Sequence, residues 1–257
     1  MPATTIGEVI GQLDEMVRWA RTQGSRLGYF AALYREVTRR VKARIEEGIF
    51  EDGRRMERLD VMFANRYFEA FEQSRAGRIP TRPWQVAFEA STRWWPIVLQ
   101  HLLLGMNAHI NLDLGIAAAR TCPGEAIRGL EEDFRKINEI LVAMIDEVEN
   151  RLAEVWPLLR VLDHLAGRTE ETVLGFSLRG ARALAWTVAT DLAPLDDREQ
   201  GSRIAELDRI VAALGEGILH PGLMAGTAAR VVRLGERRRV EEVIDLLSPE
   251  YSRKSRE

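Results

Sequence analysis

The chain has 257 residues, of which 46% are hydrophobic and 29% charged, and its formal net charge is −3. This balance argues against a disordered chain, and the slight excess of acid argues against nucleic-acid binding driven by bulk positive charge. The single cysteine, Cys122, excludes an intrachain disulfide and a cysteine-based zinc cluster.

Apolar residues recur at three- and four-residue spacing along almost the whole chain, which predicts helices. Thr5 and Thr81 are candidate N-caps, Gly48 is a candidate stop, and Pro96 is expected to kink or restart a helix. In chain order the predicted helices cover about residues 6–23, 26–47, 53–75, the stretch between Thr81 and Pro96, 97–120, 125–155, 158–166, 170–192, 203–214, 225–234 and 240–247.

No alternating strand pattern and no internal repeat occurs, so the sequence predicts one all-α domain of about eight to ten helices. We expect this helical-bundle domain to cover residues 1–248, followed by a polar tail, 249–257. The stretch LAPLDDREQGS resembles a short linker between helices. Short connections favour antiparallel packing of successive helices.

The N-terminus lacks a basic segment followed by an apolar one, so we expect a cytoplasmic protein without a signal peptide. The longest apolar run is interrupted by Pro96, Gln100 and His101, and it is expected to be too short to span a bilayer. We therefore expect a small-molecule substrate as the partner, with no nucleic acid and no membrane, and we leave open a homodimer.

Residues 100–114, QHLLLGMNAHINLDL, place two histidines, two asparagines, a glutamine and an aspartate in an otherwise apolar run. Burying so many polar groups costs free energy unless each finds a partner. We therefore expect any active site to be built around this segment.

If residues 97–120 form one regular helix, their polar side chains fall on two separate stripes. The first stripe holds His101, Gly105, His109 and Asp113, and the second holds Gln100, Asn107 and Asn111. One stripe is expected to form a structural hydrogen-bond network and the other to line a pocket, with Gly105 leaving space between the histidines. Polar and apolar residues also alternate from residue 107 to 114, which hints at a break, but helical flanks favour a helix.

Helix geometry limits how these residues can bind a metal ion. Eight residues separate the Cα atoms of His101 and His109 by about 12 Å, too far for both to ligate one ion easily. His109 and Asp113 lie one turn apart and can share an ion or a hydrogen bond. Asp60, between Leu59 and Val61, is the first choice for a carboxylate that reaches them from another helix.

Each of these residues also has a purely structural interpretation. His109 and Asp113 can be a satisfied core pair. Asp60 can form a buried ion pair with Arg66 or Arg182. Asp133 is either an acid that orients His109 or a surface charge.

Other residues are candidates for substrate binding. Asn107 and Asn111 lie in the central segment, Arg182 can bind an anionic group, and Trp186 follows it on the same predicted helix. The sequence contains no Walker A, GxGxxG, GxSxG, HExxH or ExxH motif, so it matches none of the standard nucleotide, hydrolase, zinc or di-iron patterns.

Four motifs, RLDVMFANRYFEA, HLLLGMNAHINLDLGIA, DFRKIN and ARALAW, resemble those of a bacterial family described only as a domain of unknown function. The resemblance spans roughly residues 30–190 and implies an all-helical domain, but it supplies no activity. The residues that belong to the shared pattern are Asp60, His101, Asn107, His109, Asn111 and Asp113.

Three functions stay open at this point. The first is a metal-dependent hydrolase or lyase for a small, partly apolar molecule, with zinc or iron bound by His109, Asp113 and Asp60 and with His101 as general acid or base. The second is a metal-independent cyclase or isomerase in which His101, His109 and Asp113 transfer protons. The third is a non-enzymatic ligand-binding or helical interaction protein.

Overall fold

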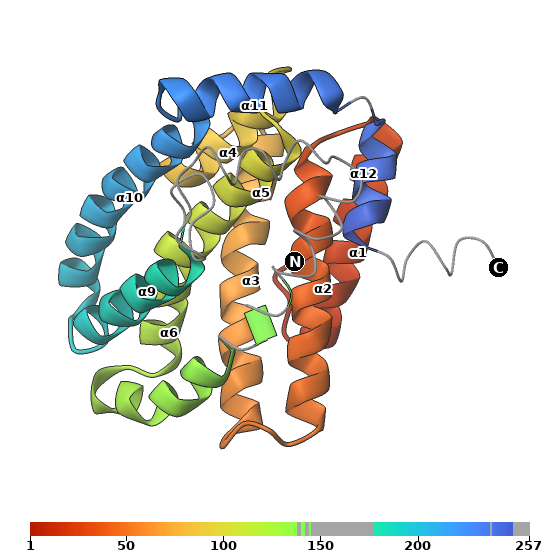
Figure 1. Ribbon diagram of the computed structural model, residues 1–257. Helices are drawn as coiled ribbons and strands as arrows, with labels where there is room; N and C mark the ends of the chain where they lie inside the picture. The colour runs from red at the N-terminus through yellow and green to blue at the C-terminus, as the bar shows by residue number, and fades with distance from the viewer. Residues whose placement is uncertain (138–139, 142–143, 145–176, 237, 249–257) are drawn as a thin grey trace.

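The computed structural model describes residues 1–137, 140–141, 144, 177–236 and 238–248. These residues are helices and their connections, with no strand among them, which confirms the all-α class (Figure 1). The helices outside the central one are α1 (Ile6–Gln23), α2 (Leu27–Glu46), α3 (Gly53–Arg75), α4 (Arg82–Thr92), η2 (Gly124–Leu130), α9 (Leu178–Leu192), α10 (Asp197–Leu219), α11 (Leu223–Gly235) and α12 (Val240–Leu247).

Local signals set several of these boundaries. The Thr5 hydroxyl accepts from the Glu8 amide and caps α1, and Gly48, at φ 70°, follows the end of α2 as the sequence predicts. The predicted linker is wrong in its second half, since Asp196 and Glu199 form a capping box that starts α10 at Asp197.

The predicted helix at 125–155 begins instead as the 3₁₀ helix η2 and continues as helix through residue 137. In the rest of that prediction, residues 140, 141 and 144 are described and are helical. Its other residues, the element at 158–166, the start of the helix at 170–192 and the polar tail lie outside the described residues.

The central helix is continuous from Val98 to Thr121 but changes its winding halfway. It consists of α5 (Val98–Met106), the π-helix η1 (Asn107–Leu114) and α6 (Gly115–Thr121). The predicted helix is therefore confirmed, and the alternating pattern at 107–114 coincides with the wide π turns. π segments are rare and are frequently found at functional sites.

By length and composition this helix could cross a membrane, which corrects the expectation that the run is too short. Its apolar part is entirely buried inside the fold. Helix α2 contacts α5, α3 contacts η1 and α6, and α4, α9 and α10 also contact η1 (Figure 1). A helix that is apolar nearly all round needs such cover.

Two glycines allow neighbouring elements to approach this central helix. A Cβ on Gly105 would lie 2.5 Å from the Phe30 ring of α2, and a Cβ on Gly115 would lie 2.8 Å from the Ala185 carbonyl oxygen of α9. The gap beside Gly105 is therefore filled by Phe30, which corrects the expectation of empty space between His101 and His109.

Candidate functional site: an aromatic-walled cavity at the π-helix

His109 and Asp113 form a buried hydrogen-bonded pair within η1. The His109 Nδ1 lies 3.4 Å from the Asp113 Oδ2, and the two residues are 2% and 1% exposed. The sequence predicts this pair from the four-residue spacing. Because Nδ1 faces a carboxylate, it carries the imidazole proton, and Nε2 is left with a free lone pair.

Two further donors hold Asp113 in place. The Arg66 Nε lies 2.7 Å from Asp113 Oδ1, and the Trp84 Nε1 lies 2.8 Å from Oδ2. Burial alone would raise the pKa of Asp113, but the Arg66 charge and the hydrogen bonds from His109 and Trp84 outweigh it and lower this pKa. Asp113 is therefore ionised at neutral pH.

Aromatic rings enclose the His109 imidazole. Phe63 stacks on it, with ring centroids 3.5 Å apart and planes 7° apart, and Tyr34 meets it edge-on at 4.5 Å. Phe30, Tyr67 and Trp84 lie between 5.7 and 6.0 Å away. This burial lowers the pKa of His109, although Asp113 opposes the shift, so the imidazole is neutral at pH 7.

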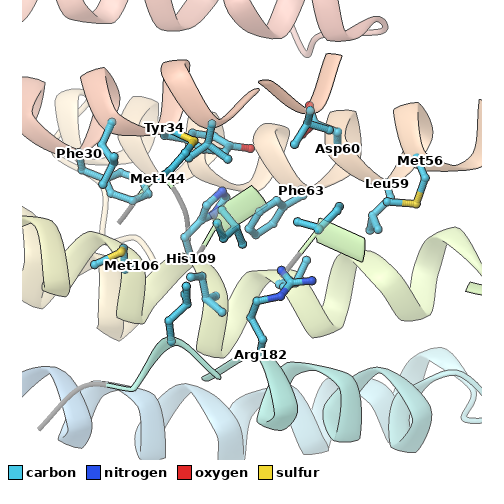
Figure 2. A pocket seen from close by; sticks show the side chains of 18 residues that line it. Phe30, Tyr34, Met56, Leu59, Asp60, Phe63, Met106, His109, Met144 and Arg182 are labelled. Carbon is cyan, nitrogen blue, oxygen red and sulfur yellow. The ribbon is translucent and has the colours of Figure 1, made fainter. Parts of the chain in front are cut away.

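His109 lines a cavity of about 70 Å³ between α2, α3, η1, α9 and the segment that follows η2 (Figure 2). A water needs roughly 10–15 Å³ on this measure, so the cavity has room for a molecule of a few non-hydrogen atoms. Aliphatic, aromatic and methionine side chains form most of its wall. The polar side chains among the described lining residues are Tyr34, Asp60, His109 and Arg182.

Three polar atoms from these lining residues are buried without a hydrogen-bond partner in the described part of the chain. They are the Tyr34 hydroxyl, the Asp60 Oδ2 and the His109 Nε2. Burial, with a smaller contribution from Glu57, raises the pKa of Asp60 to about 7. Burial, followed by the Asp60 charge, also raises the pKa of Tyr34, so its phenol keeps its proton. Unpaired polar atoms at one cavity point to a ligand that pairs with them.

The asparagine stripe forms the structural network, and the predicted substrate-binding role of Asn107 and Asn111 is not supported. The Asn107 Nδ2 donates to the Val211 carbonyl of α10, and the Asn111 Nδ2 donates to the Asn107 Oδ1. Gln100 in the same stripe donates to the Ile218 carbonyl. Neither asparagine is among the described residues that line the cavity.

His101 lies outside this cavity, so the structure does not bring the predicted general acid or base into one pocket with His109. It borders a separate space of about 20 Å³ and meets Tyr29 edge-on at 5.8 Å. Phe30 lines both spaces and separates them. Burial, together with the charges of Arg26 and Arg233, lowers the pKa of His101 to about 3, far from neutral pH.

Three other predicted residues have different surroundings. Arg182 lines the cavity, while its Nη2 donates to the Phe134 carbonyl and its guanidinium lies 4.4 Å from the Phe134 ring centroid. Trp186 packs on Phe134 at 5.1 Å and is not among the described lining residues. Asp133 is buried and accepts from the Glu51 and Asp52 amides, so it is neither a surface charge nor a partner of His109.

The predicted metal ligands do not form a suitable set. Both Asp113 oxygens already accept hydrogen bonds, and Arg66 binds Asp113 rather than Asp60. Of the three predicted residues, only His109, through Nε2, and Asp60 remain as possible ligands of a metal ion. Within the described residues no group of three or more histidine, cysteine, aspartate or glutamate side chains is arranged to hold a metal ion.

Sequence reasoning missed Tyr34, Phe63 and Trp84 as site residues because each resembles an ordinary core aromatic. The sequence predicts Arg66 as a partner of Asp60, whereas the structure pairs it with Asp113. One signal could have found Arg66 and Phe63 together, since both lie on the helix of Asp60 at three-residue spacing and therefore near one face.

The fold and the site define a class, namely an all-helical protein with a buried histidine–aspartate pair at an apolar cavity. The chain belongs to a family of unknown function, DUF5995, whose model matches residues 6–221. No curated protein and no solved structure matches the sequence. The family match covers every residue of the cavity described above and ends before α11.

Proposed function

We propose that this protein is an enzyme that binds a small, largely apolar molecule in the cavity and transfers a proton at the His109 Nε2. The observation that carries the proposal is the pair itself. Asp113 fixes the proton on Nδ1, and Nε2 is buried at the cavity wall without a partner among the described residues. A general base needs this combination of a defined tautomer and a free lone pair.

The protonation states favour a base. Because burial lowers the pKa of His109, its imidazole is neutral at pH 7 and accepts a proton. The ionised Asp113 then stabilises the imidazolium that forms, and Arg66 and Trp84 hold that carboxylate in position. The donor set does not favour a metal ion, so this mechanism is the metal-independent one.

Proton exchange on nitroethane, a carbon acid small enough for the cavity, tests this proposal. We expect the protein to accelerate exchange of its carbon-bound protons in deuterium oxide, as followed by proton NMR. His109→Gln should reduce the rate to background. His101→Gln is the matched control, because it changes the other buried histidine of the same helix and should leave the rate unchanged.

Two results contradict the proposal. A full equivalent of zinc or iron in protein purified without a histidine tag, together with loss of exchange after chelation, favours the metal-dependent hydrolase or lyase. If the protein binds cyclopentane, an apolar probe of similar size, but does not accelerate proton exchange on nitroethane, a non-enzymatic ligand-binding protein is favoured.

A further inference from the structure

The cavity contains two polar side chains that the proton transfer at His109 does not use. Tyr34 comes from α2 and Asp60 from α3, and both line the cavity with side chains at least nine-tenths buried. The Tyr34 hydroxyl and the Asp60 Oδ2 have no hydrogen-bond partner in the described part of the chain. Figure 2 shows the Tyr34 hydroxyl directed toward the side of the cavity where Asp60 lies.

From this geometry we infer that Tyr34 and Asp60 form a pair of hydrogen-bond donors for a carbonyl oxygen, and that the substrates are small, uncharged carbonyl compounds. This inference rests on the proposed function and names its substrate class. The Tyr34 ring lies edge-on to His109, with centroids 4.5 Å apart, so a bound molecule of a few atoms can contact both groups.

The protonation states of the pair agree with this role. The Tyr34 phenol keeps its proton, and Asp60, with its pKa raised to about 7, is protonated in a large share of molecules at neutral pH. A tyrosine hydroxyl and a protonated aspartic acid in an apolar site make an effective oxyanion hole.

The chemistry that follows is enolisation. The His109 Nε2 forms a bond to a proton on the carbon next to the carbonyl, and the C–H bond breaks. Its electron pair forms a C=C bond to the carbonyl carbon, and the C=O π pair moves onto the oxygen. Tyr34 and Asp60 donate to that oxygen, and the imidazolium then returns the proton to the same carbon or to a conjugated one. No oxidant or reductant is needed.

An uncharged substrate fits the wall better than a carboxylate. The described lining is almost wholly apolar, so a charged ligand loses its hydration without replacement. Arg182 is the one cation in that lining, and it already donates to the Phe134 carbonyl and lies over the Phe134 ring.

Cyclopentanone and cyclopentane are the probes for a binding test, because they match in size and differ in the carbonyl. We expect Tyr34→Phe to weaken cyclopentanone binding roughly five- to tenfold, about the value of one hydrogen bond, without weakening cyclopentane binding. The downfield shift of the ¹³C-labelled carbonyl on binding should shrink in Tyr34→Phe and in Asp60→Leu. Asp60→Asn, which keeps an N–H donor, should restore it. Val41→Ala, which alters the apolar wall, should change both affinities in parallel.

The same variants are then tested for deuterium exchange at the carbon next to the cyclopentanone carbonyl. Tyr34→Phe should slow this exchange roughly 100-fold, as loss of one oxyanion donor does elsewhere. The inference is overturned if Tyr34→Phe changes neither the binding of cyclopentanone nor its exchange. If nitroethane exchange still depends on His109 in that case, the proposed function stands. Tighter binding of cyclopentanecarboxylate than of cyclopentanone also overturns it. Loss of His109-dependent exchange with both substrates overturns the proposed function itself.

Discussion

Phe63 lies flat against the His109 imidazole, with ring centroids 3.5 Å apart and planes 7° apart. Together with the hydrogen bond to Asp113, this stacking fixes the imidazole in both rotation and tilt. A base that is already held in its reactive orientation pays no entropy to reach that orientation during the reaction, and this increases the rate. Phe63 is thus a positioning residue for His109.

Phe63→Leu should therefore increase the mobility of the His109 imidazole while the protein stays folded. We expect a loss of about 2 kcal/mol in the free energy of unfolding, since a buried aromatic pair contributes about 0.5–1.5 kcal/mol beyond its area. The same change should slow nitroethane exchange and broaden the His109 ring signals in NMR spectra. Unchanged ring signals and rate would show that Asp113 alone orients the imidazole.

Asp113→Asn should stabilise the wrong tautomer of His109. The amide can donate to Nδ1, which moves the imidazole proton to Nε2 and removes the lone pair from the cavity. We expect nitroethane exchange to fall roughly 10³- to 10⁴-fold, as for the equivalent change in a catalytic triad.

The stability of Asp113→Asn should fall by about 3 kcal/mol, because Arg66 loses its charged partner. Denaturant unfolding measures this loss. A variant with normal exchange and reduced stability would assign Asp113 a structural role only.

Asp60 should make the protein less stable as the pH rises from about 4 to about 7. Its pKa in the folded state is about 7 against an ordinary value of 3.8. Across this window the unfolded chain has released the proton that the folded chain retains, so folding is favoured at the acid end. The shift corresponds to on the order of 4 kcal/mol.

Asp60→Asn removes this dependence. The difference in unfolding free energy between the variant and the wild type should therefore grow in favour of the variant from pH 4 to pH 7 and then stay level. Denaturant unfolding at several pH values measures it. Parallel profiles for the two proteins would mean that Asp60 has an ordinary pKa.

His101 should have the opposite effect on acid stability. Its folded pKa of about 3 lies below the ordinary value of 6.5, so only the unfolded chain takes up the proton between these values. The wild type therefore loses stability as the pH falls through this window. Between neutral pH and pH 4, we expect the unfolding free energy of His101→Phe to fall by roughly 3 kcal/mol less than that of the wild type. Equal acid sensitivity of variant and wild type in denaturant unfolding would contradict this.

Gly105→Ala should force Phe30 out of its position, because the added Cβ would lie 2.5 Å from the ring. Overpacking of this kind costs about 1–3 kcal/mol. Phe30→Leu makes room, so the double variant should lose less stability than the two single changes predict together. Additive losses in thermal unfolding would show that the backbone, rather than Phe30, absorbs the clash.

Local chemistry explains how far the sequence could predict the fold. Amphipathic spacing and caps such as Thr5 depend on neighbouring residues only, so helices such as α1 and α12 agree with prediction closely. The start of α10 was missed although its signal, Asp196 followed by Glu199, is present in the sequence. The π winding of η1 appeared only as an alternating pattern with no geometric meaning in an α-helix.

The site was predictable where it is local and unpredictable where it is assembled from distant parts. His109 and Asp113 are four residues apart, so their pairing follows from helix geometry. Arg66 and Trp84 reach Asp113 across 47 and 29 residues, and only the packing of α3 and α4 on η1 brings them there. For the same reason the sequence alone could not show that Phe30 separates His101 from the cavity.

The π-helix allows the direction of the His109 and Asp113 side chains to change independently of the packing of the helical turns on either side. The eight residues Asn107–Leu114 wind in wider turns than the α-helical residues on either side, so their side chains leave the helix at angles that an α-helix does not give. Gly105 and Gly115, which contact α2 and α9 closely, lie outside this segment, so we expect a change of winding within Asn107–Leu114 to leave both contacts in place. Only the side chains inside the wide turn, His109 and Asp113 among them, would be redirected.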